Sequence, residues 1–118
     1  MADYYEDPVY KTLESIIKSA GVKIDYVDVI PDDVYARSHY EGNYIQMPVT
    51  DPFDDVEHAC LVLGHEMGHI LSRYDTDDRL EIRTYNEAVC DLIGVYLYRL
   101  ACMNYEKQME TLFKSQAE

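Results

Sequence analysis

Residues 58–71 of the chain read His-Ala-Cys-Leu-Val-Leu-Gly-His-Glu-Met-Gly-His-Ile-Leu. Drawn as a helix, this stretch is apolar nearly all round, so we expect a buried helix rather than an exposed one. His65 and His69 are four residues apart and would lie on one face, one above the other. Glu66 lies beside them, and a buried cluster of two imidazoles and a carboxylate needs compensation, which a metal ion provides. The stretch therefore predicts a buried helix that carries a metal site.

The spacing His-Glu-x-x-His suits zinc chemistry in particular. Neutral imidazoles are good zinc ligands, and a glutamate next to them can act as a base on water. By chance the motif would occur in well under ~1% of chains of this length. The alternative, two surface histidines beside a solvated glutamate, conflicts with the apolar residues around the motif. We therefore predict Zn2+ as the cofactor, with His65 and His69 as ligands and Glu66 as the catalytic base.

A catalytic zinc site needs a third protein ligand, and an acidic segment downstream supplies one. Seventeen residues lie between His69 and Glu87, enough for the end of one helix, a short turn and the start of an antiparallel helix. Asp91 lies one turn after Glu87 and could accept a hydrogen bond from the free ring nitrogen of His65. We predict Glu87 as the third ligand and Asp91 as the residue that orients His65. The alternative is that both are ordinary surface acids, in a chain that has 23 acidic residues.

Glycines inside the two segments also need a physical reason. A glycine in a helix interior costs about 1 kcal/mol relative to alanine. We expect Gly68 to permit close approach of the second helix or of the sheet. Helix packing without functional meaning is the alternative for Gly68, and it applies equally to Gly64 and Gly94.

The rest of the sequence predicts a helix, then strands, then further helices. Pro8 suits a first helical turn and Gly21 a helix end, while Glu41-Gly42-Asn43 has the composition of a hairpin turn. Pro48 ends the last strand or marks it as an edge. The expected elements are a helix at 8–20, strands at 22–30, 34–40 and 43–47, a turn at 31–33, a helix from a start at 50–55 to about 74, a connection at 75–78, a helix at 80–103 and a final amphipathic helix at 104–118. This order predicts an α+β fold with a three-stranded antiparallel sheet against helices.

Length and composition limit the class of protein. The chain has 118 residues, of which 47% are hydrophobic and 28% charged, which fits one folded domain spanning residues 1–118. No apolar run approaches the ~18–20 residues that cross a bilayer, and the acidic start lacks the apolar stretch of a secretory signal. The three cysteines form no C-x-x-C pair and indicate buried, reduced thiols, at Cys60, Cys90 and Cys102. We therefore expect a cytoplasmic location.

The formal net charge of −13 restricts the partners. Such a surface repels phosphate groups, which argues against direct binding to nucleic acid or to anionic membranes. Acidic proteins can instead imitate nucleic acid or bind basic proteins. A decoy for a DNA-binding protein therefore stays open as an alternative function.

The two segments together resemble a known class of enzymes. His65-Glu66-x-x-His69 followed by Asn86-Glu87-x-x-x-Asp91 is similar to the gluzincin zinc metallopeptidases. The sequence HEMGHIL … NEAVCDLIG resembles those of the ImmA/IrrE metallopeptidase family and of compact minigluzincins. The region of resemblance covers about residues 43–95. The resemblance implies a small zincin-like fold and zinc-dependent endopeptidase activity. It also implies His65, His69 and Glu87 as ligands, Glu66 as general base and proton shuttle, and Asp91 as a support for the ligands.

The resemblance further implies a class of substrate. Members of the ImmA/IrrE family are linked to the cleavage or control of helix-turn-helix repressors in mobile elements or stress responses. Antirestriction-associated zincin domains have a similar lead-in to the motif, which suggests a phage or mobile-element origin. The expected partner is a protein or peptide substrate, and the sequence leaves the oligomeric state open.

Hydrolysis also needs a group that stabilises the oxyanion of the tetrahedral intermediate. Four side chains are candidates, with packing or surface positions as the alternative for each: His39, Tyr40, Tyr44 and Tyr85. His58 lies seven residues before His65 on the same helix face and is expected at the rim of the site rather than on the metal. The strand at 43–47, as an edge strand, would pair with an extended substrate backbone.

Two main functions of different classes therefore remain. The first is a zinc-dependent endopeptidase for a specific protein. The second is a zinc-stabilised interaction module, such as an anti-repressor, that binds a protein without cutting it. A purely structural zinc site has no need of a base, so Glu66 favours the peptidase.

Overall fold

A computed structural model describes residues 3–28, 30, 35–39, 41–50, 52–72 and 79–117 of the chain. One α-helix precedes the strands and two follow them. The elements in chain order are a 3-10 helix at Asp3–Glu6, α1 at Pro8–Ser19, β1 at Lys23–Val27, β2 at Arg37–His39, β3 at Tyr44–Pro48, α2 at Val56–Leu71 and α3 at Leu80–Ala117. The fold is therefore α+β, as predicted. Two predicted connections, at 31–33 and 75–78, lie outside the described residues.

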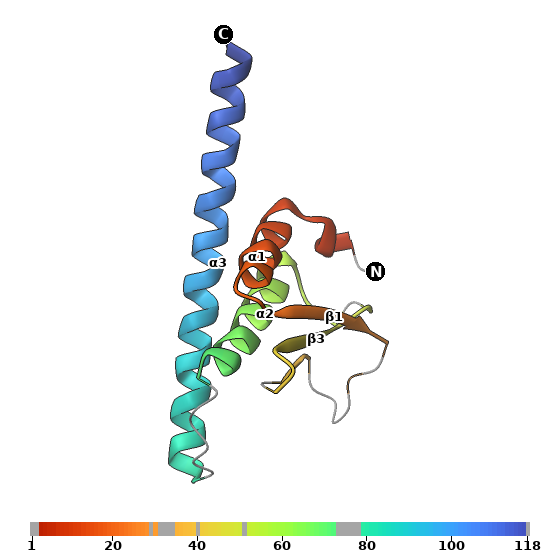
Figure 1. Ribbon diagram of the computed structural model, residues 1–118, viewed down its shortest axis with the longest axis vertical. Coiled ribbons are helices and arrows are strands. Elements are labelled where there is room, and N and C mark those ends of the chain that lie inside the picture. Colours follow the sequence, from red (N-terminus) through yellow and green to blue (C-terminus); the bar gives the residue numbers. More distant parts are fainter. Residues whose placement is uncertain are drawn as a thin grey trace.

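The elements form three layers (Figure 1). The sheet packs against one side of α1 and α2, and α3 runs along the other side of these two helices. The helix α2, which carries the His-Glu-x-x-His sequence, therefore lies between the sheet and α3. Its side chains Cys60, Leu63 and Met67 are buried, which confirms the expectation of a buried helix.

The sheet is mixed, with the strand order β1-β3-β2. The strands β2 and β3 form the expected antiparallel hairpin, and Asn43 in its turn has a left-handed conformation with φ of 51°. β3 also pairs with β1, in parallel, with Ile24 opposite Ile45 and Tyr26 opposite Met47. The prediction of an antiparallel sheet was wrong because β3, rather than β2, takes the place next to β1.

The central strand is β3, and β2 forms an edge. Ile45 and Met47 of β3 are fully buried, whereas the residues of β2 are half-buried. The most apolar strand thus has a neighbour on each side. The nine residues between Val27 and Arg37 give the chain enough length to form the edge strand β2 before it returns as the central strand β3. The interpretation of 43–47 as an edge strand was therefore wrong, and Pro48 marks the end of the strand.

Capping residues define the starts of α1 and α2. The side chain of Asp7 accepts a hydrogen bond from the backbone of α1, and Pro8 occupies the first turn. Asp55 caps α2 in the same way, accepting from the N–H of His58 at 2.8 Å. The start of α1 at Pro8 agrees with the prediction, and α2 begins directly after the start predicted at 50–55. At its other end α2 stops at Leu71, short of the predicted end near 74.

Tyrosine rings fill the space between α1 and the sheet. The ring of Tyr5 lies 4.9 Å from that of Tyr10 and 4.8 Å from that of Tyr26. The hydroxyl groups of Tyr10 and Tyr26 are hydrogen bonded to each other at 2.9 Å, and Tyr26 also donates to the carboxylate of Glu14. The hydroxyls of Tyr10 and Tyr26 are thereby satisfied, which allows these two tyrosines to serve as core in a chain without tryptophan.

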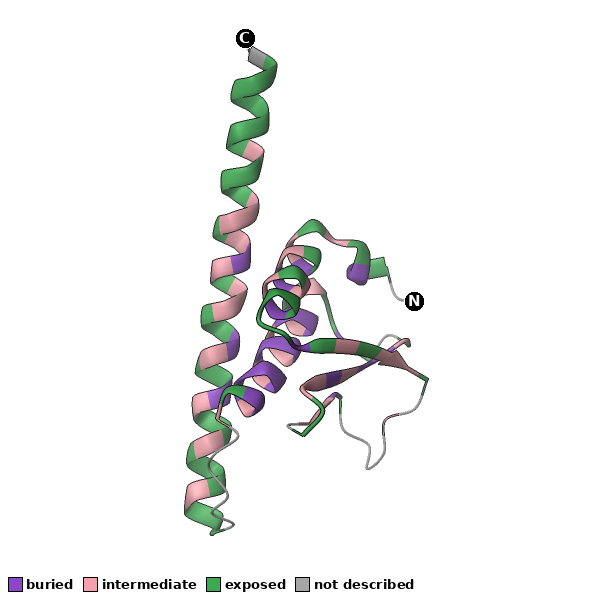
Figure 2. Ribbon diagram, viewed as in Figure 1, coloured by how far each residue is buried: buried purple, intermediate pink, exposed green. Residues whose placement is uncertain are grey.

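The last element, α3, is a single helix of 38 residues. The prediction of a separate helix at 104–118 was wrong, because no glycine or proline follows Gly94 and the last turns continue the same helix. Those turns project beyond α1 and are largely exposed (Figure 2), so the molecule measures 59 × 27 × 25 Å. Within the described residues, no helix combines the length and the apolar composition needed to cross a bilayer.

Candidate metal centre

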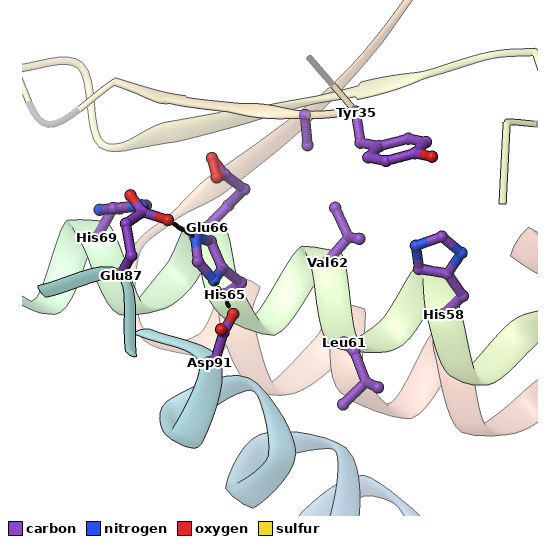
Figure 3. A pocket seen from close by; sticks show the side chains of 10 residues that line it. Tyr35, His58, Leu61, Val62, His65, Glu66, His69, Glu87 and Asp91 are labelled. Atoms are coloured by element: carbon purple, nitrogen blue, oxygen red, sulfur yellow. Dashed lines mark hydrogen bonds and ion pairs between the residues drawn. The ribbon is translucent and has the colours of Figure 1, made fainter. Parts of the chain in front are cut away.

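Two helices bring the predicted ligands together (Figure 3). His65 and His69 lie one turn apart on α2, and Glu87 reaches them from α3. The Nε2 atoms of the two histidines are 3.1 Å apart. Oε2 of Glu87 lies 2.9 Å from Nε2 of His65, and Oε1 lies 3.0 Å from Nε2 of His69. Three donor groups therefore face one point between the helices.

The spacing of these donors fits one small divalent cation. Zinc binds imidazole nitrogen and carboxylate oxygen at about 2.0–2.2 Å in a tetrahedral arrangement, which places two ligand atoms about 3.3 Å apart. Here the two Nε2 atoms are 3.1 Å apart, and each lies 2.9 or 3.0 Å from a different oxygen of the Glu87 carboxylate. Two nitrogens and one carboxylate also match the donor set of zinc sites that keep their fourth position for water or substrate. The residues present therefore fit a zinc ion.

Asp91 orients the ring of His65. Its Oδ1 lies 2.6 Å from Nδ1 of His65, while Glu87 contacts the other ring nitrogen. A carboxylate accepts hydrogen bonds and donates none, so with a metal ion on Nε2 the proton of the neutral ring would be on Nδ1. Nε2 then presents its lone pair toward Glu87 and His69. This is the hydrogen bond between Asp91 and His65 that the sequence predicted.

Glu66 lies next to the ligand atoms and is itself buried. It is 8% exposed, and one donor atom from each of His65, Glu66 and His69 lies within 4.8 Å of the other two. Burial raises the pKa of Glu66 to about 7, a shift that His65 opposes and Glu87 enhances. Burial also lowers the pKa of His69, which favours the neutral ring that binds metals. The site thus combines imidazole and carboxylate donors with the carboxyl of Glu66, which can hold a proton.

Glycines allow α2 and α3 to approach closely at the site. A β-carbon on Gly68 would lie 3.0 Å from the α-carbon of Cys90, and one on Gly64 would lie 2.7 Å from the α-carbon of Gly94. The expectation that Gly68 permits close approach is confirmed, and its neighbour is α3 rather than the sheet. This contact between backbones is what brings Glu87 within reach of α2.

The ligand group opens into a pocket of about 650 Å³. One end of the pocket holds the five polar residues of the site, which are His65, Glu66, His69, Glu87 and Asp91. The other end is lined by Tyr35, Ala36, His58, Leu61 and Val62 (Figure 3). His58 thus lines the pocket two turns away from His65 and outside the ligand group, as predicted.

Three of the four predicted oxyanion candidates do not line this pocket. His39 and Tyr44 lie opposite each other in the sheet and stack with ring centres 4.3 Å apart. Because side chains alternate along a strand, both lie on the face opposite to Ile45, which is buried toward the helices. Tyr85 is 65% exposed on α3. The structure therefore does not bring these three to the metal site, and Tyr40 lies outside the described residues.

Tyr35 and Ala36 are the lining residues that the sequence did not reveal. Both precede β2 in a stretch without helical periodicity. Their approach to α2 depends on where the edge strand packs, which is a long-range contact. The one available signal was an aromatic residue within a predicted strand, and that signal is common in proteins.

Comparisons of this chain with protein-family models, with curated proteins and with solved structures found no match. The chemistry of the site therefore rests on its own residues. Those residues are contributed by two helices whose separation is fixed by Gly64, Gly68 and Gly94.

Proposed function

We propose that the protein is a zinc-dependent endopeptidase of the gluzincin type, built on a small zincin-like domain. The observation that carries the proposal is that Glu87 of α3 lies within 3.0 Å of both His65 and His69 of α2. Asp91 behind His65 and the buried Glu66 beside the ligands are two further groups that zinc hydrolysis uses. A purely structural zinc site has no use for such a base.

The chain's own residues divide the steps of hydrolysis between them. When bound, zinc would polarise the substrate carbonyl and lower the pKa of water toward ~7. Glu66 accepts the proton of the attacking water and then delivers it to the leaving amine. Asp91 keeps the ring of His65 in place throughout, because its carboxylate holds the proton on Nδ1.

An extended substrate would pair with β2. The strand β3 has a neighbour on each side, whereas β2 is an edge strand and packs against α2. Among the described strands none pairs with the outer side of β2, and a strand edge offers N–H and C=O groups to an incoming chain. The backbone pairing expected from the sequence is thereby moved from β3 to β2. An open pocket beside a strand edge suits a polypeptide better than a compact metabolite.

Charge favours a basic protein as the substrate. A net charge of −13 attracts cationic polypeptides and repels nucleic acid and anionic lipid. A DNA-binding repressor, the substrate class implied by the resemblance to the ImmA/IrrE family, meets this requirement. With such a substrate, we propose a cytoplasmic location for the reaction.

Metal analysis of the purified 118-residue chain tests the site. We expect one zinc ion per chain, removable by a chelator. Glu87→Gln should weaken zinc binding, whereas Glu81→Gln, which changes an exposed acid at the start of the same helix, should leave it unchanged. Equal zinc affinity in Glu87→Gln and the wild type would remove Glu87 from the ligand set.

Hydrolysis is tested with a mixture of unfolded basic proteins and mass spectrometry of the new termini. Glu66→Gln should retain zinc and lose about 10²–10⁴-fold in rate, because the proton transfers lose their base. Full activity in Glu66→Gln would refute the mechanism. A wild-type chain that binds zinc and cuts none of these proteins would favour the non-catalytic interaction module.

A further inference from the structure

Three aromatic rings close the end of the pocket that lies away from the metal ligands. We call this end, lined by Tyr35, Ala36, His58, Leu61 and Val62, the aromatic end. The ring of Tyr35 lies 5.8 Å from that of Phe53 and 5.3 Å from that of His58, and Phe53 and His58 are 5.3 Å apart. Phe53 is buried, whereas Tyr35 is 52% exposed. The cluster thus anchors one side of Tyr35 and leaves much of the residue accessible.

His58 is held in a defined orientation within this cluster. The N–H of Asp54 donates to Nδ1 of His58 at 3.2 Å, and the N–H of His58 donates to the capping Asp55 at 2.8 Å. A ring nitrogen that accepts a hydrogen bond carries no proton, so the proton of the neutral ring is on Nε2. Over the part of the chain that the structure describes, Nε2 of His58 has no hydrogen-bond partner. One N–H donor at this end is therefore available to a ligand.

Apolar side chains separate the rings from the metal ligands. Val62 lies between His58 and His65 on the pocket side of α2 (Figure 3). Among the described residues that line the aromatic end none is acidic, and the carboxylate of Asp54 lies 3.7 Å from Nδ1 of His58. His58 precedes His65 by two helical turns, which is about 10 Å along the axis. An extended polypeptide advances about 3.3 Å per residue, so this distance corresponds to about three residues.

We propose that the aromatic end binds a large apolar side chain, aromatic by preference, of the polypeptide that reaches the metal centre. An accessible tyrosine ring attracts another ring through edge-to-face contact. The N–H of His58 suits a carbonyl or hydroxyl oxygen of the same residue. The position of this residue, about three residues from the bond that is cut, rests on the proposed function, whereas the binding itself does not.

The binding is tested without metal or catalysis, by NMR of the ring signals of Tyr35 and His58. N-acetyl-phenylalaninamide should shift both signals with a dissociation constant on the order of 10 mM, and N-acetyl-alaninamide should not. Tyr35→Ala should weaken this binding about three- to tenfold, judged by the His58 signal. Tyr96→Ala, which removes an exposed ring from α3, is the matched control and should bind as the wild type does. Equal shifts with both compounds, or unchanged binding in Tyr35→Ala, would overturn the proposal.

The position of the preferred residue is tested with zinc-loaded protein and a peptide library from a digested proteome. Cleaved peptides should be enriched in Phe, Tyr or Leu at one position about two to four residues from the cut bond. Tyr35→Ala should lose this enrichment and Tyr96→Ala should keep it. Cleavage without any such preference would refute the placement of the aromatic end. Binding of the phenylalanine amide without any cleavage would instead refute the peptidase and leave the aromatic end as a binding site.

Discussion

The α-carbon of Gly94 lies 2.7 Å from the position that a β-carbon on Gly64 would occupy. In the other direction, a β-carbon on Gly94 would lie 2.9 Å from the carbonyl oxygen of Leu61 and 3.0 Å from the backbone nitrogen of His65. The two helices therefore touch backbone to backbone one residue away from a predicted zinc ligand. The distance from Glu87 to the histidines depends on this contact.

Gly64→Ala should therefore damage both the fold and the site. The added methyl group would collide with the backbone of α3, and overpacking of this kind costs about 1–3 kcal/mol. The helix propensity gained, about 1 kcal/mol, offsets part of that cost. We expect a lower urea midpoint and weaker zinc binding, because α3 carries Glu87 away from α2. A variant with wild-type stability and zinc affinity would show that the two backbones are farther apart in solution.

Asp91→Ala should weaken zinc binding without unfolding the chain. The side chain of Asp91 is 74% exposed, so its loss costs little packing, but the ring of His65 loses its fixed orientation. Loss of such a supporting carboxylate typically lowers metal affinity about 10–100-fold. Competition with a fluorescent zinc chelator measures the change. Glu106→Ala, an exposed acid farther along α3, is the control, and an equal loss of affinity in both variants would contradict a specific role for Asp91.

Zinc should stabilise the folded chain. An ion that binds the folded state alone, at a free concentration of 100 times its dissociation constant, adds about 2.7 kcal/mol to the free energy of unfolding. The gain should disappear with EDTA and in His69→Ala. It should also decline at acid pH, because protonated imidazoles do not bind metals. Thermal unfolding at several pH values, with and without zinc, tests each point, and a melting temperature independent of zinc would argue against the site.

The buried cysteines should resist alkylation while the chain is folded. Burial raises the pKa of Cys60 to about 12 and that of Cys90 to about 11. The reactive thiolate is therefore scarce at pH 8, and access is blocked as well. Mass spectrometry after brief iodoacetamide treatment should find label on the half-buried Cys102 before the other two.

The same shifts predict a loss of stability at high pH. The folded state keeps its thiol protons above pH 9.0, the ordinary pKa of the thiol, whereas the unfolded chain releases them. This contribution to the free energy of unfolding is complete below pH 9.0 and is lost as the pH rises toward 12. The urea midpoint should therefore fall between pH 8 and pH 10.5. Rapid labelling of Cys60 in the folded chain would contradict its burial.

The candidate site was easier to predict from the sequence than the sheet. The placement of His65 and His69 follows from the period of one helix, and that of Glu87 follows from one short connection. Local geometry therefore determined which side chains meet. The order of the strands depends instead on which edge of the sheet packs against α2, and no local sequence pattern predicts that long-range contact. For the same reason His39 and Tyr44 were expected at the site, whereas Tyr35 was not.

The length of α3 also could not be predicted from the pattern of apolar residues. Few apolar side chains follow residue 103, so the segment 104–118 was interpreted as a separate element. That segment is rich in strong helix formers, such as Glu, Lys, Gln, Met and Leu, and contains no glycine or proline. Intrinsic propensity thus continues the helix where burial no longer requires it.

Because α3 is one uninterrupted helix, a change in its tilt relative to α2 would move Glu87 relative to the two histidines. Gly94, where it crosses α2, is about 10 Å along the axis from Glu87. A tilt of α3 by about 10° about Gly94 would displace the Glu87 carboxylate by roughly 2 Å. This is far more than the ~0.2 Å that metal coordination tolerates. A partner that pulls on the exposed C-terminal turns of α3 would thus change the position of Glu87, the proposed third ligand.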